Sequence, residues 1–96
     1  MISFLIVMKS EVKKNLIEIA KEFNLKKLVL FGSSIESPDS AKDIDLACEG
    51  VTGRQFLRLG LKLENIFDKP VGLVMIEEKN SFIQEILKEG VHIYES

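Results

Sequence analysis

Two aspartates form the first group of residues in this chain whose types and spacing could do chemistry. Asp43 and Asp45 belong to a stretch that alternates carboxylates with apolar residues, DIDLAC at positions 43–48. Residues two apart on a strand point to the same face, so both carboxylates project together, with Cβ atoms about 6–7 Å apart. Two carboxylates this close repel each other unless a cation lies between them, and Mg²⁺ or Mn²⁺ prefers such oxygen ligands. The aspartate pair therefore indicates a divalent-metal site.

A glycine–serine pair, Gly32 and Ser33, provides a second chemical feature eleven residues before Asp43. It follows the apolar run LVLF at positions 28–31, which is typical of a buried strand, and it opens a polar, turn-rich stretch over 32–42. A glycine there lets the backbone approach a phosphate, and the N–H groups and hydroxyl that follow can donate to its oxygens. A phosphate site beside a metal pair is the equipment for phosphoryl or nucleotidyl transfer.

Each of these patterns also has a simpler structural explanation. A glycine–serine pair after a strand is often only a turn and a helix cap, and alternating aspartates often form a solvated strand face. Cys48 falls on the apolar side of its strand and is expected to be inert core. His92 has no partner at ligand spacing and is expected to be structural. Arg54 and Arg58 share a helical face that could meet phosphates, although a solvated face is the simpler interpretation.

Helices and strands alternate along the chain and must position these residues. Apolar periodicity and turn residues predict, in order, a helix over 10–24, strands over 28–31 and 43–48 (the latter with one buried face), a helix from 52 to about 66, a strand over 71–76, a helix from 80 or 81 to 89, and a strand over 91–94. This order predicts an α/β (α+β) two-layer sandwich, with helices packed on a mixed sheet of about four to five strands.

The last helix is expected to bury Phe82 together with Ile83, Ile86 and Leu87, and to end at Gly90 in the position after its C-cap. At the other end of the chain, the apolar residues 1–8 lack a basic segment and a cleavage site, so a signal peptide is not expected. They fit either an edge strand or a stretch upstream of a translation start at Met8. In the second case, residues 1–7 are dispensable.

Composition limits the class of protein. A chain of 96 residues fits a single domain over 1–96, and one cysteine excludes an internal disulfide and a cysteine-rich zinc site. The net charge of −2 provides no basic field, so direct binding to nucleic acid is not expected. No apolar run approaches the 18 residues of a membrane span. These features predict a cytoplasmic domain without a membrane segment.

The run from Phe31-Gly32-Ser33 through a polar loop to Asp43-Ile44-Asp45-Leu46 resembles the signature of the DNA polymerase β-like nucleotidyltransferase superfamily. The small size most resembles its minimal nucleotidyltransferase (MNT) branch, whose members prokaryotes commonly pair with HEPN-domain toxins. The resemblance covers residues 8–94, nearly the whole chain.

This resemblance implies a nucleotidyltransferase fold and assigns roles to the residues above. Gly32, Ser33 and Ser34 would hold a nucleoside triphosphate, and Asp43 and Asp45 would bind Mg²⁺ (or Mn²⁺) and act in catalysis. The implied reaction transfers a nucleoside monophosphate, AMP from ATP, to an acceptor hydroxyl. The implied partner is a HEPN-type protein.

The chain departs from the family pattern in three places. Where relatives often carry a further glycine, this loop has Ser34, Glu36 and Ser37, and where they usually have serine before the first aspartate it has Lys42. The third departure concerns the third carboxylate, which ligates metal and helps to activate the acceptor; here Gly72 occupies its position.

No neighbouring carboxylate fills the position of Gly72 without an unusual bend. Glu78 has the same strand parity but lies about 20 Å further along an extended strand, Glu77 has the opposite parity, and Glu49 is about 13 Å from Asp45. Three functions therefore remain open. The protein is a nucleotidyltransferase that acts on a partner protein, a catalytically degenerate antitoxin-like module that neutralises a HEPN-type RNase by contact, or an unrelated α/β domain.

Overall fold

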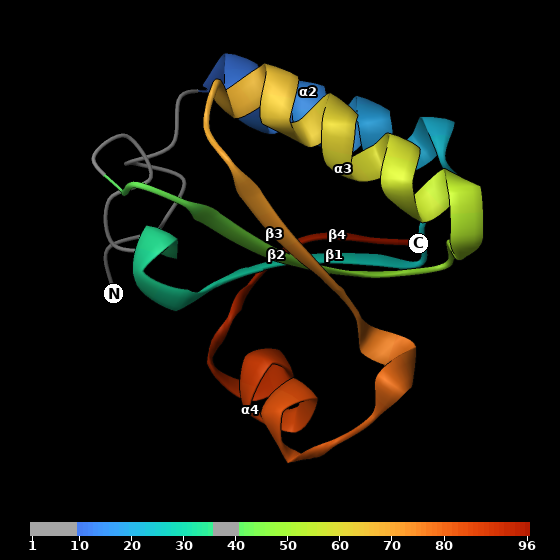
Figure 1. Ribbon diagram of the computed structural model, residues 1–96, viewed down its shortest axis with the longest axis vertical. Coiled ribbons are helices and arrows are strands. Elements are labelled where there is room, and N and C mark those ends of the chain that lie inside the picture. Colours follow the sequence, from blue (N-terminus) through green and yellow to red (C-terminus); the bar gives the residue numbers. More distant parts are fainter. Residues whose placement is uncertain (1–9, 36–40) are drawn as a thin grey trace.

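A mixed β-sheet lies at the centre of the protein, with helices on both of its faces (Figure 1). The computed structural model describes residues 10–35 and 41–96. The elements are α2 (Ser10–Glu22), β1 (Lys27–Phe31), the 3₁₀ helix η1 (Gly32–Ile35), β2 (Ile44–Glu49), α3 (Gly53–Phe67), β3 (Val71–Met75), the 3₁₀ helix η2 (Ile76–Glu78), α4 (Ser81–Glu89) and β4 (Val91–Glu95). The predicted strand or early start at residues 1–8 and the loop residues Glu36 and Ser37 lie outside the described residues.

Four strands form the sheet in the described part of the chain, in the order β3-β2-β1-β4. The strand β1 pairs antiparallel with both β2 and β4, whereas β2 pairs parallel with β3. Parallel neighbours need a crossover connection, and α3 provides it. The predicted fold class, helices packed on a mixed sheet of about four to five strands, is confirmed.

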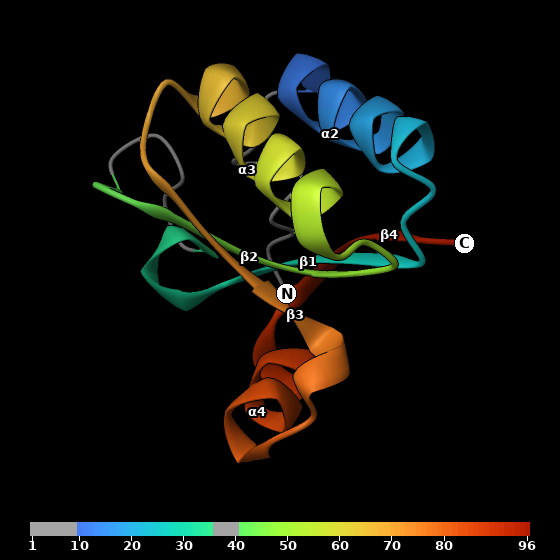
Figure 2. The same ribbon diagram turned by 45° about the vertical axis from the view of Figure 1, so that its right-hand side comes forward.

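The larger part of the core lies between the sheet and the helices α2 and α3, which run side by side over one face (Figure 2). Leu16 and Ala20 of α2 and Leu59 and Leu63 of α3 are fully buried there. The sheet contributes the residues of one strand parity, namely Leu28, Leu30, Ile44, Leu46 and Cys48. Lys62 also joins the two helices by an ion pair with Glu22, with 3.0 Å between Nζ and Oε2.

The helix α4 covers the opposite face of the sheet (Figures 1 and 2). Ile83 and Ile86 of α4 pack with Ile76 against Val29 and Ala47, which have the other strand parity. The expectation of one buried face for residues 43–48 was therefore wrong at Ala47, because α4 buries the second face. The same geometry leaves Asp45, two residues before Ala47, on the α4 side of the sheet.

The connections around α4 confirm the predicted cap and differ in two details from the sequence-based expectations. Asn80 caps the helix, since its Oδ1 accepts a hydrogen bond of 2.9 Å from the backbone N–H of Ile83. Phe82 was expected in the core but is 55% exposed. The strand β3 stops at Met75, so Ile76 belongs to η2.

Gly90 ends α4 as expected, but in an extended backbone conformation (φ −78°, ψ 169°) and not in the left-handed one. Close packing requires glycine at this position, because a Cβ atom there would lie 2.6 Å from both Val29 Cγ1 and the carbonyl oxygen of Ile86. Glycine therefore allows the chain to pass directly from α4 into β4, which pairs with β1.

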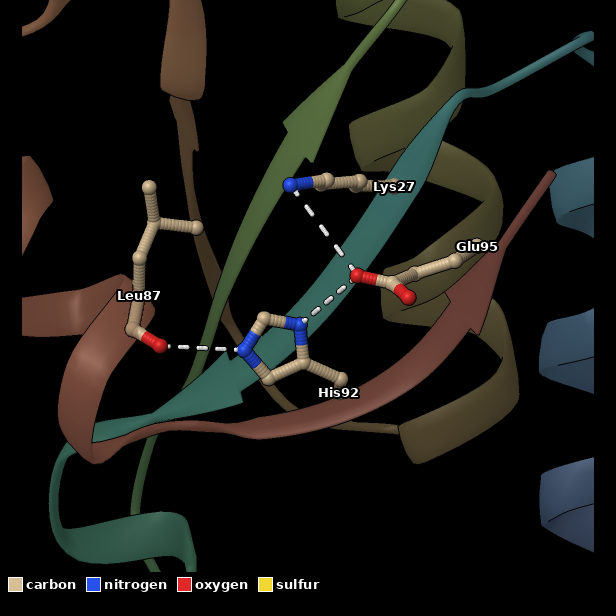
Figure 3. Close-up of polar contacts among 4 residues, drawn as sticks. All are labelled: Lys27, Leu87, His92 and Glu95. Carbon is tan, nitrogen blue, oxygen red and sulfur yellow. Dashed lines mark hydrogen bonds and ion pairs between the residues drawn. The ribbon is translucent and has the colours of Figure 1, made fainter.

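His92 has the structural role that the sequence predicted (Figure 3). Its Nε2 lies 3.0 Å from the carbonyl oxygen of Leu87, and its Nδ1 lies 3.3 Å from Glu95 Oε2. The same carboxylate oxygen lies 3.9 Å from Lys27 Nζ. These contacts join the last turn of α4 to β4 and β1, and the exposure of the charged groups limits their contribution to stability.

Candidate functional site

Asp45 lies between two glycines, near the start of β2. It pairs with Phe31 of β1 on one side and with Gly72 of β3 on the other. A Cβ atom on Gly32 would lie 2.5 Å from Asp45 Oδ2, and one on Gly72 would lie 3.0 Å from Oδ1. The two glycines thus leave the space that the Asp45 carboxylate occupies.

Gly32 is required for a second reason, because its φ of +76° lies in the left-handed region that side chains rarely adopt. This conformation turns the chain from β1 into η1 beside the start of β2 (Figure 1). The backbone of Ser33 and Ser34 lies in η1. The first N–H groups of a helical turn have no partner within it, so they suit a phosphate oxygen at this edge of the sheet.

Asp43 precedes β2 directly and is exposed, while Asp45 is only partly exposed. Burial raises the pKa of the Asp45 carboxyl, and the charge of Asp43 raises it further. The structure therefore brings the two carboxylates within electrostatic range, although Asp43 lies one residue before the strand that was expected to contain it. A divalent cation between them would relieve the repulsion and favour ionised Asp45, so the donor set fits Mg²⁺ or Mn²⁺.

Gly72 stands beside Asp45 where a third carboxylate would complete the set. The parallel pairing of β2 and β3 puts the two residues next to each other on the α4 side of the sheet. Among residues 10–35 and 41–96, no three His, Cys, Asp or Glu side chains come together at a metal-binding spacing. Within the described residues, the candidate metal site therefore has two carboxylates, those of Asp43 and Asp45.

Neither glutamate of η2 replaces the missing group. The earlier placement of Glu78 on an extended continuation of β3 was wrong, since β3 ends at Met75. Glu77 instead accepts a hydrogen bond of 2.8 Å from the backbone N–H of Gly50, in the turn after β2. That turn lies at the far end of β2 from Asp45.

The remaining candidates from the sequence do not contribute to this site. Cys48 is fully buried, and burial, with a smaller effect of Glu77, raises the pKa of its thiol to about 12, so it is inert core as expected. Arg54 and Arg58 are exposed on α3, which covers the face of the sheet opposite Asp45. The structure does not bring them to the aspartates.

Sequence reasoning missed one aromatic feature near the aspartates. The rings of Phe31 and Phe82 meet edge to face, with centroids 5.9 Å apart and an interplanar angle of 83°. Phe31 is the cross-strand partner of Asp45, so this aromatic pair adjoins the site on the α4 side of the sheet. The position of Phe31 immediately before Gly32 was the one available signal.

The comparison with known families identifies the class of domain to which this fold belongs. The family described as Polymerase beta, Nucleotidyltransferase matches residues 14–96, so the chain belongs to this family. No curated protein sequence matches it significantly.

Several similar solved structures are described as toxin–antitoxin structures. One is a complex of MntA and HepT, at 20% identity and a TM-score of 0.69 over 92% of this chain and 74% of that one. A second is a tri-AMPylated HEPN toxin of Shewanella oneidensis with its MNT antitoxin, at 21% identity and a TM-score of 0.70, with 93% and 74% covered. A third is a toxin–antitoxin structure with AMP-PNP, at 21% identity and a TM-score of 0.72, with 88% and 73% covered. At this identity the likeness shows a shared fold.

None of the helices in the described residues is long and apolar enough to cross a membrane.

Proposed function

We propose that this protein binds ATP with Mg²⁺ (or Mn²⁺) and transfers AMP to a hydroxyl of a HEPN-type partner protein in the cytoplasm. The observation that carries the proposal is the position of Asp45. A Cβ atom on Gly32 would lie 2.5 Å from its carboxylate oxygen Oδ2, so the carboxylate lies beside the Gly32 turn, and the charge of Asp43 raises its pKa. A phosphate site and a metal pair therefore share one edge of the sheet. The family membership and the AMP-PNP and tri-AMPylated toxin in similar structures support the same reaction.

Each residue has a defined task in this proposal. The backbone of Gly32, Ser33 and Ser34 holds the phosphates, and Asp43 and Asp45 bind the metal. The metal supplies charge neutralisation for the phosphates. The acceptor oxygen forms a bond to the α-phosphorus, the bond from that phosphorus to the bridging oxygen breaks, and pyrophosphate leaves. Because Gly72 provides no base, the hydroxyl proton passes to water, which favours a slow reaction.

A second function, neutralisation of a HEPN-type RNase by contact alone, is favoured by Gly72. Its pairing with Asp45 leaves the described part of the site one carboxylate short of the family pattern. A protein of this kind would keep its fold and its partner surface without turnover. Neither function requires this chain to bind nucleic acid directly.

One experiment separates the two functions. The protein is incubated with a HEPN-type partner encoded beside it, with Mg²⁺ and with ATP labelled at the α-phosphate. Transfer predicts label on the partner, loss of its RNase activity, and loss of both effects with Asp45→Asn. Neutralisation by contact predicts no label and equal inhibition by the parent and by Asp45→Asn. Absence of label together with Mg²⁺-independent ATP binding would contradict the transferase proposal.

A further inference from the structure

Phe82 is an apolar side chain that the fold does not need for its core. It is 55% exposed, and it belongs to neither of the two core clusters of the described residues. The helix α4 is already held against the sheet by Ile83 and Ile86, which are nearly fully buried. An exposed aromatic ring on a short helix is unfavourable in water, so a ligand that covers it would gain free energy.

Phe31 holds the Phe82 ring in a defined orientation. The two rings meet edge to face at 5.9 Å, an arrangement that the charge distribution of aromatic rings favours. Phe31 itself is partly buried against the core under α4. The Phe82 ring is therefore supported by Phe31, and about half of the residue remains exposed to solvent.

The pair of Phe31 and Phe82 lies next to the proposed metal and phosphate residues. Phe31 precedes Gly32 and lies opposite Asp45 in the antiparallel pair of β1 and β2. Side chains at opposed positions share a face, with Cβ atoms about 4.5–5.5 Å apart. Asp45, Phe31 and Phe82 thus form a row on the α4 side of the sheet, in which Phe31 neighbours both of the others.

A nucleoside triphosphate matches this row in chemistry and in scale. Its phosphates suit the end at Gly32 and Asp45, and its base is attached through one ribose. Every nucleobase has a π-face that stacks on an aromatic side chain. On the other face of the sheet, α2 and α3 pack directly on β1 and β2, which leaves the α4 side for the base.

We propose that Phe82, supported by Phe31, is the stacking surface for the nucleobase of the bound nucleoside triphosphate. This inference rests on the proposed function, since it assumes that the phosphates bind at Gly32 and the aspartates. It adds a binding residue outside the glycine–serine and aspartate motifs, on a helix that follows them in the chain.

Two ligands test the inference, because inorganic tripolyphosphate has the phosphates of ATP and no base. Calorimetric titrations with Mg²⁺ compare the two ligands on the parent, on Phe82→Ala and on Phe82→Leu, which keeps apolar volume without a ring. We expect both variants to bind ATP about tenfold more weakly than the parent does. We expect them to bind tripolyphosphate as tightly as the parent does. Leu57→Ala is the matched control, because Leu57 is also exposed (66%) but lies on α3, across the sheet.

Fluorescence provides a second readout that does not depend on affinity. The chain contains no tryptophan, so Phe82→Trp introduces a single indole at the proposed stacking position. We expect Mg²⁺-ATP to quench its emission and Mg²⁺-tripolyphosphate to leave it unchanged. Leu57→Trp should respond to neither ligand.

The outcomes separate this inference from the proposed function. Unchanged ATP affinity in Phe82→Ala, with unquenched Phe82→Trp, would overturn the stacking role while the parent still bound ATP with Mg²⁺. Equal weakening of ATP and tripolyphosphate would also overturn it, because the ring would then act on the fold or the phosphate site. A parent that bound neither ligand would overturn the proposed function and the inference together.

Discussion

At the scale of single residues, the environment of Asp45 opposes its own charge. The carboxylate is partly buried between Gly32 and Gly72, and the charge of Asp43 acts on it, so both effects raise its pKa. A divalent cation reverses this balance, because it is attracted only to the ionised form. Protein stability and metal binding are therefore linked through this one residue.

The substitution Asp45→Asn should stabilise the metal-free protein slightly at neutral pH. The pKa of Asp45 is raised above its ordinary value of 3.8, so the folded state disfavours the ionised form. The resulting penalty is absent below pH 3.8, grows as the pH rises toward the folded-state pKa, and is complete above it. We expect Asp45→Asn to gain less than about 1 kcal/mol at pH 7 and nothing near pH 3, measured by urea unfolding. A variant that is less stable than the parent at pH 7 would contradict this reading of the site.

Restoring a carboxylate at position 72 should make the protein dependent on metal and more active. Aspartate fits the backbone there, since the φ of Gly72 is not positive, and its Cβ would meet only the movable end of the Asp45 side chain, at 3.0 Å. We expect Gly72→Asp to unfold at a lower temperature than the parent without metal, and Mg²⁺ to reverse the loss.

The same variant should transfer AMP about tenfold faster than the parent or more, because it regains a positioned general base. Gly72→Asn is the matched control, of equal size and without the charge, and it should show neither metal rescue nor faster transfer. A parent already as active as Gly72→Asp would mean that another group supplies the base.

At the scale of elements, the site depends on where β1 ends and how η1 leaves it. The same chemical change, glycine to alanine, should therefore have opposite effects at two positions. Gly32 has a φ of +76° and a Cβ atom there would lie 2.5 Å from Asp45 Oδ2, whereas a Cβ atom on Gly60 of α3 would make only an ordinary 4.0 Å contact with Leu73.

We expect Gly32→Ala to lose about 1–3 kcal/mol of unfolding free energy, and Gly60→Ala to gain up to about 1 kcal/mol from the better helix propensity of alanine. Urea unfolding of both variants gives the comparison. ATP affinity should fall in Gly32→Ala alone. Equal stability of the two variants would mean that the turn at Gly32 adapts to a side chain.

The sequence predicted the elements more fully than their mutual placement. The apolar periodicity correctly predicted that Leu59 and Leu63 of α3 are buried, because residues on one helical stripe share an environment. It did not reveal that α4 covers the second face of the sheet, since a stripe of apolar residues does not specify which surface it meets. For this reason Ala47 was expected on a solvated face and Phe82 in the core, and both expectations were wrong.

The candidate site followed the same division. Strand parity predicted that Asp45 points to one side of the sheet, but the partner of a strand residue depends on register, which parity alone does not fix. The pairing of Asp45 with Gly72 was implied by the family resemblance and is observed in the structure. The Phe31–Phe82 contact joins residues 51 positions apart, and the position of Phe31 before Gly32 did not indicate Phe82 as its partner.

At the scale of the whole molecule, the described site residues and their supports come from residues 31–82, after the first helix. The helix α2, which begins at Ser10, packs on the face of the sheet opposite Asp45. Nucleotide and metal binding should therefore be insensitive to changes at the start of the chain.

A chain that begins at Met8 should accordingly fold and bind Mg²⁺-ATP as the full chain does. We expect cooperative urea unfolding and equal ATP affinity by calorimetry, because α2 and the site residues remain intact. The competing expectation follows from Phe4, Leu5 and Ile6. If these residues add an edge strand, their loss should cost a few kcal/mol, at roughly 1.5–3 kcal/mol for each buried side chain. Weaker ATP binding by a shortened chain that still unfolds cooperatively would contradict the prediction, since it would give the first seven residues a part in the site.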